Sequence, residues 1–124
     1  MNRQRPVNLD LTSLKYPPMA IASILHRVSG VILFILFPAL LYFLSWSLHS
    51  EAAFQEVKAW LANPFCKLLF WAFSAAAAYH LLAGTRHLIM DIGFGEELKA
   101  GRMSAVFVIV LALVLAIFLG IWIW

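Results

Sequence analysis

The sequence predicts an all-α membrane protein: three transmembrane helices with a short N-terminal arm on the cytoplasmic side. Of its 124 residues, 64% are hydrophobic and only 12% are charged, a balance far from that of a soluble domain. The apolar residues also form three segments of about 20 residues or more, the length that a helix needs to cross a bilayer. We expect these spans at about residues 20–48, 65–90 and 104–124, within one membrane domain that covers residues 1–124.

The first span follows a polar arm that ends at Pro17-Pro18 and is predicted to lie on the membrane surface or against a soluble partner. Proline is favoured in the first turn of a helix, so we expect the helix to begin at Pro18. Its apolar pattern continues to Leu48, which corresponds to about 45 Å of helix for roughly 30 Å of hydrocarbon. The first turns should therefore stand in the headgroup zone or beneath a protein cap. Their polar residues and glycine are Ser23, His26, Arg27, Ser29 and Gly30.

Ser23, Arg27 and Gly30 share one face of this helix, and His26 lies next to that face. A hydroxyl, an imidazole and a guanidinium at the membrane boundary could hold a polar ring with an acidic substituent. The Arg27 guanidinium suits a carboxylate, such as a haem propionate, or a quinone carbonyl. Snorkelling to a lipid phosphate accounts for Arg27 equally well. For Ser23 taken alone, a hydrogen bond to its own helix backbone is the better-supported alternative.

The second span contains two histidines, His80 and His87, in an otherwise apolar helix. Seven residues at about 100° each bring His87 to within roughly 20° of His80, about 10 Å further along the axis. Gly84 lies between them and would let a flat, bulky group such as a haem approach the backbone. Because both histidines point the same way, at most one ligates a given haem iron; if that ligand is His80, the second comes from another helix, in this chain or in a partner. The alternative is that His80 only hydrogen-bonds a neighbouring helix.

The charges of the arm and connections predict the orientation. Lysine and arginine number four through Arg27, three in the connection of residues 86–103, and two around the connection of residues 50–64. The positive-inside rule then places the N-terminus in the cytoplasm and the C-terminus in the periplasm. All five tryptophans fall on the outer side in this topology, where indoles favour the interface. The polar N-terminal start predicts no cleavable signal peptide, which favours a multi-pass protein of a bacterial inner membrane.

The remaining features predict no chemistry of their own. Three spans with short connections leave no room for a nucleotide fold or a nucleic-acid-binding module, and the net charge of +3 is a topology signal. Any soluble chemistry must therefore come from a partner. The single cysteine, Cys66, is interpreted as a small apolar residue near a helix start. Ser104 is the expected N-cap of the third span, after a connection in which we expect three glycines to break the helix. They are Gly93, Gly95 and Gly101.

Two signatures make the sequence similar to the cytochrome b membrane-anchor subunits of succinate dehydrogenase (respiratory complex II), and the three-span layout covers the whole chain. The first signature is Arg5-Pro6 followed by Ser23-Ile24-Leu25-His26-Arg27-Val28-Ser29. The second is the segment His80 to Gly84, then Arg86-His87 and Met90-Asp91 with Gly93.

The resemblance implies a single membrane-anchor domain that pairs with a second membrane-anchor subunit, with one haem b shared between them. His80 would be one axial ligand of the haem iron, the second anchor subunit would give the other histidine, and His26 and Arg27 would lie near the propionates. Ser23 and Arg27 would belong to a ubiquinone site beneath the iron–sulfur subunit, and a flavoprotein subunit would oxidise succinate. His87 is assigned only to the haem's polar surroundings. The isolated chain should catalyse nothing by itself.

Three other interpretations remain open. One is a purely structural anchor whose histidines only pack, and another is a haem b subunit of a different quinone-linked dehydrogenase. A small transporter is less well supported, because the sequence contains neither an inverted repeat nor a pair of broken helices.

Overall fold

The computed structural model describes residues 15–124, and every regular element in that range is a helix. The helices are α1 (Pro18–Ser47), α2 (Glu51–Leu61), α3 (Pro64–Asp91) and α4 (Leu98–Ile123). Three of them, α1, α3 and α4, are long and apolar enough to cross a membrane. The all-α class and the three spans are thus confirmed. The predicted arm falls almost wholly on residues 1–14, outside the described residues.

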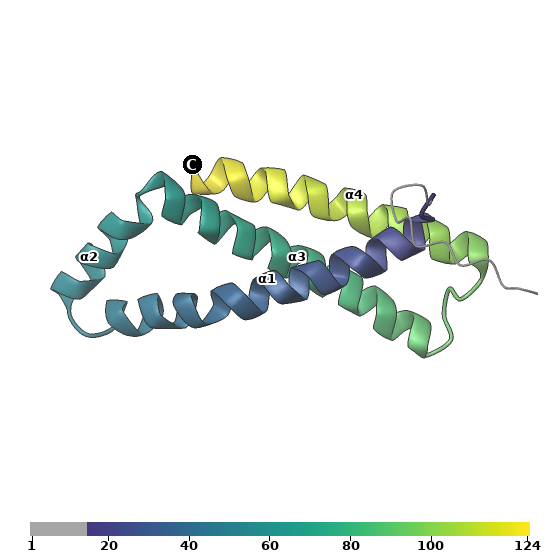
Figure 1. Cartoon of the computed structure of the whole chain (residues 1–124), viewed down its shortest axis with the longest axis horizontal. Coiled ribbons are helices and arrows are strands. Elements are labelled where there is room, and N and C mark those ends of the chain that lie inside the picture. Colours follow the sequence, from purple (N-terminus) through teal and green to yellow (C-terminus); the bar gives the residue numbers. More distant parts are fainter. Residues whose placement is uncertain (1–14) are drawn as a thin grey trace, which may run out of the picture.

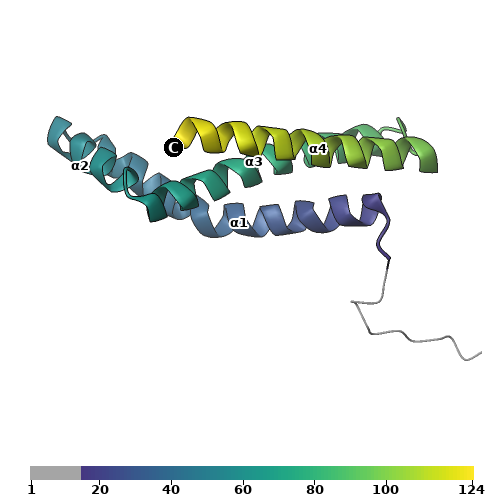
Figure 2. The ribbon, with the colours of Figure 1, turned by 90° about the horizontal axis from the view of Figure 1, so that it is seen from above.

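The three long helices form a thin antiparallel bundle in which α3 packs against both α1 and α4. Figure 1 shows α1 crossing α3, and Figure 2 shows α1 and α4 at opposite edges of the bundle. One end, called the polar end below, combines the first turns of α1, the last turns of α3 and the first turns of α4. The opposite end, called the tryptophan end, holds α2 and the adjoining ends of the long helices, and all five tryptophans belong to its elements.

The start of α1 agrees with the prediction, whereas α2 was not expected. Pro18 occupies the first turn of α1, but residues 50–64 are more than a connection. The Ser50 hydroxyl caps α2 by accepting the backbone N–H of Ala53 at 3.1 Å, and Glu51 in the first turn and Lys58 in the last complement the helix dipole. Ala53 and Val57 are buried, and α2 packs against α1 and α3. The connection is therefore a short amphipathic helix.

The start of α4 differs from the prediction. The helix begins at Leu98, six residues before Ser104, and its N-cap is Glu97 with no side-chain cap bond. Gly93 and Gly95 do break the chain, since both have a positive φ that glycine adopts without strain. Gly101 lies inside α4, where the helices approach closely: a Cβ there would lie 2.9 Å from the Met19 sulfur. Its role is close packing, and the interpretation of Gly101 as a breaker was wrong.

The described part of the bundle has a small core and a largely exposed apolar surface. The buried core cluster consists of Tyr79, Ala83, Val108 and Ala112, where α3 meets α4. Interhelical hydrogen bonds supplement it, because the Tyr79 hydroxyl donates to the Ala22 carbonyl at 2.7 Å and the Trp71 indole donates to the Ala116 carbonyl at 2.8 Å. Large apolar side chains such as Phe34, 82% exposed, cover the outside of the spans. Such a surface suits lipid or a partner subunit.

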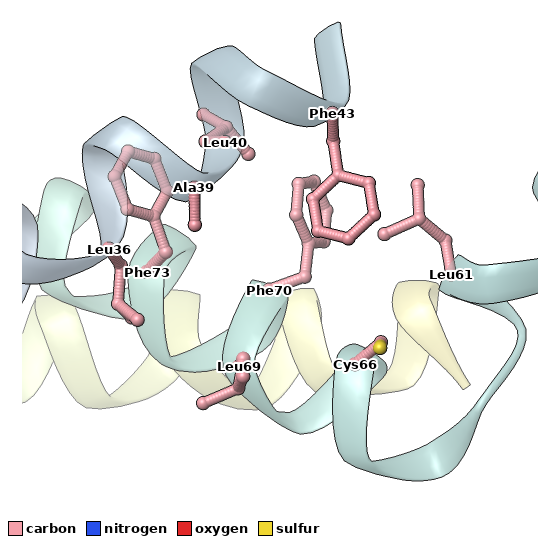
Figure 3. A pocket seen from close by; sticks show the side chains of 9 residues that line it. All are labelled: Leu36, Ala39, Leu40, Phe43, Leu61, Cys66, Leu69, Phe70 and Phe73. Atoms are coloured by element: carbon pink, nitrogen blue, oxygen red, sulfur yellow. The ribbon is translucent and has the colours of Figure 1, made fainter. Parts of the chain in front are cut away.

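A small apolar cavity of about 70 Å³ lies between α1, α2 and α3 near the tryptophan end, and Figure 3 shows its lining side chains. Cys66, the third residue of α3, points into it among leucine and phenylalanine side chains. This agrees with the interpretation of Cys66 as a small apolar residue near a helix start. The residues that line the cavity are Leu36, Ala39, Leu40, Phe43, Leu61, Cys66, Leu69, Phe70 and Phe73.

Candidate functional site

Three imidazoles gather at the polar end, where α1 crosses α3. The His26 ring, from α1, stacks on that of His80, from α3, with centroids 4.0 Å apart and an interplanar angle of 14°. His26 also contacts His87 edge to face, at a centroid distance of 5.2 Å. The two α3 histidines thus share one face, as their spacing predicted. The flat group beside Gly84 is the His26 ring, because a Cβ on Gly84 would lie 3.4 Å from His26 Nε2.

The His26 ring stacks on that of His80 and meets that of His87 edge to face, so the three rings are not arranged around a common point. Within residues 15–124, no three histidine, cysteine, aspartate or glutamate side chains are placed to hold one metal ion together. The cluster is therefore unsuited to chelating a bare ion. This arrangement is compatible with the expectation that no more than one of His80 and His87 ligates a given iron.

His80 is fixed to α1 through one nitrogen of its ring. Nδ1 lies 3.0 Å from the Ser29 hydroxyl and 3.2 Å from the His26 carbonyl oxygen. Nε2 forms no hydrogen bond with any described residue. Part of the alternative interpretation thus holds, since His80 does hydrogen-bond a neighbouring helix. The second nitrogen, however, is left for another partner.

Gly30 makes this close approach possible. A Cβ on Gly30 would lie 3.2 Å from Cε1 of His80, tighter than ordinary van der Waals contact, so a larger residue would push the ring from α1.

Nε2 of His26 is buried and has no hydrogen-bond partner among the described residues. An unpartnered buried polar atom is uncommon and calls for a functional explanation.

Ser23 and Arg27 lie on α1 at the polar end, and neither contributes a hydrogen bond to the three imidazoles. Arg27 is exposed and forms no ion pair with any described residue, so its guanidinium can reach a lipid phosphate or a bound group. Ser23 is half-buried, and its hydroxyl forms no hydrogen bond within the described residues, including its own helix backbone. The hydrogen bond from Ser23 to its own helix backbone, which was the better-supported alternative from the sequence, is therefore not present in the structure.

The Arg86 side chain, part of the second signature, is used within the fold. It is 7% exposed, and its Nε donates to the Ser104 hydroxyl at 3.0 Å while a terminal nitrogen donates to the Gly101 carbonyl at 2.9 Å. Ser104 in turn donates to the same carbonyl at 3.1 Å. Sequence reasoning missed this contact and that of Ser29, because both depend on which helices touch.

The described fold and site define a class of protein: a small multi-pass membrane subunit that gathers imidazoles where two spans cross. Comparison with known proteins narrows the class. The chain belongs to the family of succinate dehydrogenase/fumarate reductase transmembrane subunits, whose model matches residues 1–119.

Individual relatives agree with this assignment. The chain is 45% identical to the succinate dehydrogenase cytochrome b556 subunit of Coxiella burnetii, over the full length of both chains. It is 33% identical to the subunit of the same name from Rickettsia typhi, over 95% of this chain and 92% of the relative. It is 32% identical to the subunit of the same name from Paracoccus denitrificans, over 91% of this chain and 87% of the relative.

These similarities confirm the predicted relationship to the cytochrome b anchor subunits of complex II. The chain is a subunit of a larger enzyme and is not a catalyst by itself. Its three spans and its bacterial relatives also make it a multi-pass protein of an inner membrane.

Proposed function

We propose that this chain holds one haem b, shared with a second membrane-anchor subunit, and forms part of the ubiquinone-reducing site of a succinate dehydrogenase. His80 gives one axial ligand to the haem iron, and the second anchor subunit gives the other. Electrons from succinate reach quinone through the flavoprotein and iron–sulfur subunits. The word cytochrome in the names of the relatives supports the haem.

The observation that carries this proposal is that only one of the two ring nitrogens of His80 is hydrogen-bonded within the described residues. Nδ1 is bonded to α1, and Nε2 has no partner among the described residues. Ligating histidines are typically held in this way, with the second nitrogen bonded to a carbonyl or another polar group that fixes the tautomer. An iron ligand is also a sufficient reason for an imidazole inside an apolar span.

The neighbouring residues fit a haem as well. Gly30 and Gly84 keep the backbone clear of the imidazoles, and Nε2 of His26 is a buried polar atom without a partner among the described residues. His26 and Arg27 supply polar and cationic groups for the propionates, and His87 belongs to the same polar surroundings. Bound by two histidines, the haem supplies one-electron transfer and offers no open position for oxygen.

Ser23 and Arg27 contribute to the quinone site. Both can donate a hydrogen bond to a quinone carbonyl, and neither donor is occupied by a described residue. Arginine is too basic to release its proton readily, so Arg27 orients the quinone and stabilises negative charge that develops on it. Protons for quinol formation come from water or a partner residue. The polar end then faces the cytoplasm, beneath the iron–sulfur subunit.

The test is a dithionite-reduced minus oxidised absorbance spectrum of the purified complex with His80 intact and with His80→Ala. We expect a low-spin b-type signal that is lost or shifted in the variant while the subunits stay assembled. His49→Ala is a matched control, because His49 is exposed just beyond the end of α1 at the tryptophan end and its ring bonds only the Ser45 carbonyl, within the same segment. An unchanged spectrum in His80→Ala would contradict the proposal.

One observation favours the structural anchor as a second candidate: His80 does hydrogen-bond α1, as a packing histidine would. That candidate predicts no haem signal that depends on His80. The other alternative, a haem b subunit of a different quinone-linked dehydrogenase, predicts soluble partners other than a flavoprotein and an iron–sulfur subunit in the purified complex.

A further inference from the structure

We propose that Ser29 is a positioning residue that sets how strongly His80 donates electrons to the haem iron, through the hydrogen bond at Nδ1. The inference rests on the proposed function, because it takes His80 as the ligand. It adds a residue that touches neither the iron nor the quinone and acts through the imidazole alone.

The hydrogen bonds around Ser29 determine which nitrogen of His80 carries the proton. The Ser29 hydroxyl donates its single proton to the His26 carbonyl at 2.8 Å, so it can only accept from Nδ1 of His80 at 3.0 Å. The His26 carbonyl, 3.2 Å from Nδ1, is also an acceptor. Nδ1 is therefore the protonated nitrogen, and the lone pair lies on Nε2.

Burial makes this arrangement effective. Ser29 is 4% exposed, and Ser29 and Arg86 are the only buried polar or charged residues in the described range. Water therefore competes little for the hydroxyl, and a hydrogen bond in such surroundings is stronger than one in solvent. The next residue is Gly30, which lets the ring approach α1 to within the reach of the Ser29 side chain. Ser29 thus bonds one edge of the His80 imidazole, and Gly30 leaves room for that edge beside α1.

A hydrogen bond donated from Nδ1 makes the ligand more basic at Nε2, which favours the ferric state and lowers the reduction potential of the haem. Loss of the Ser29 acceptor should therefore move the midpoint potential to a more positive value. The His26 carbonyl would remain, so the tautomer and the haem should be retained. Ser29 lies six positions after Ser23, so the two side chains point about 120° apart around the helix. A change at Ser29 thus leaves the quinone-facing residues in place.

The experiment is an equilibrium redox titration of the haem in the intact complex, with wild type, Ser29→Ala and Ser29→Thr. We expect a positive shift for Ser29→Ala and a potential near wild type for Ser29→Thr, because a threonine hydroxyl in a helix can bond the same i−3 carbonyl. Ser74→Ala is the matched control. Ser74 lies in α3, the helix of His80, and its hydroxyl bonds only the Phe70 carbonyl of its own helix, so its removal should leave the potential unchanged.

A wild-type potential in Ser29→Ala, or an equal shift in Ser29→Ala and Ser29→Thr, would overturn the inference. If Ser29→Ala loses its haem, then a haem at wild-type potential in Ser29→Thr still supports a role for the hydroxyl, whereas loss in both variants argues against it. These outcomes differ from failure of the proposed function, which would appear as a wild-type complex without haem or as a spectrum insensitive to His80→Ala.

Discussion

Polar groups within an apolar span need partners, and the residues of the polar end meet that need in two ways. Some find partners inside the chain: Ser29 bonds the His26 carbonyl and His80. Others, namely Ser23, Arg27 and Nε2 of His26, have no hydrogen-bond partner among the described residues. An unpartnered polar group in a low-dielectric environment costs free energy. The second set is therefore where a ligand or another subunit gains most by binding.

Arg27 is the residue for which this argument gives the sharpest prediction. Arg27→Ala should lower quinone reduction about tenfold or more, the effect of losing one hydrogen bond to a charged group, and should spare succinate oxidation with a soluble acceptor. Ser23→Ala should raise the apparent quinone KM severalfold, as loss of one neutral hydrogen bond would. Steady-state assays with both acceptors measure these effects, and Arg102→Ala, at an exposed arginine of α4, is the control. Equal losses with the two acceptors would mean that Arg27 serves assembly.

At the residue scale, the spacing of His80, Gly84 and His87 was sufficient to predict their shared face, because helical geometry is local. The ring beside Gly84 could not be predicted in the same way. His26 fills that place only because α1 crosses α3 at this level, and a crossing point depends on packing between elements. The hydrogen bond between His80 and Ser29 was missed for the same reason.

At the scale of elements, α3 organises the bundle through polar side chains that reach its neighbours. Tyr79 bonds α1, and both Trp71 and Arg86 bond α4. Interhelical hydrogen bonds add to the close packing of small residues such as Ala83, 1% exposed, and Ala105, 0% exposed. The sequence shows which polar side chains α3 has, but it does not show their partners. Those partners are mainly backbone carbonyls of the neighbouring helices, which no sequence pattern marks.

Arg86 provides a test of this organisation. Arg86→Met should lower the free energy of unfolding of the membrane domain by about 1–3 kcal/mol, since it removes the two bonds that a charged side chain makes to α4. A lower melting temperature of the purified complex, followed by circular dichroism, would report the loss. Arg102→Met replaces an exposed arginine of α4 and should leave the melting temperature near that of wild type. An equal decrease in both variants would contradict the role of Arg86.

The two errors in predicting elements have different physical origins. Ser50, directly before α2, and Glu51, its first residue, form a recognisable helix start, so α2 was predictable from its cap and its amphipathic pattern. The early start of α4 was not, because Leu98 follows a glutamate that makes no side-chain cap bond. Gly101 also weakens a helix on propensity alone, so a helix that continues through it is not what its residue type predicts.

At the scale of the whole molecule, the bundle is too thin to bury its own apolar surface. No large side chain in the described range is fully buried, and exposed leucine, isoleucine, valine and phenylalanine side chains cover all three spans. In water such a surface would aggregate, whereas in a bilayer it is solvated by lipid or covered by a partner. The number of spans was predictable because it depends on length and hydropathy alone. The sites where partners bind were not, since they depend on surfaces that another chain completes.

The orientation of the molecule is the last prediction, and it follows from charge. The polar end and the arm carry seven of the nine lysines and arginines, and such an excess favours the cytoplasmic side. The chain has one cysteine, so Cys66→Ala leaves a background for single reporters at Glu56→Cys in α2 and Glu96→Cys beside α4, both at exposed positions. In intact spheroplasts, a membrane-impermeant maleimide should label the cysteine at position 56 at once and that at position 96 only after the membrane is opened. Labelling of both positions by a permeant maleimide controls for reactivity. The reverse pattern would place the haem and quinone residues on the periplasmic side, where electrons from a cytoplasmic iron–sulfur subunit could not reach them directly.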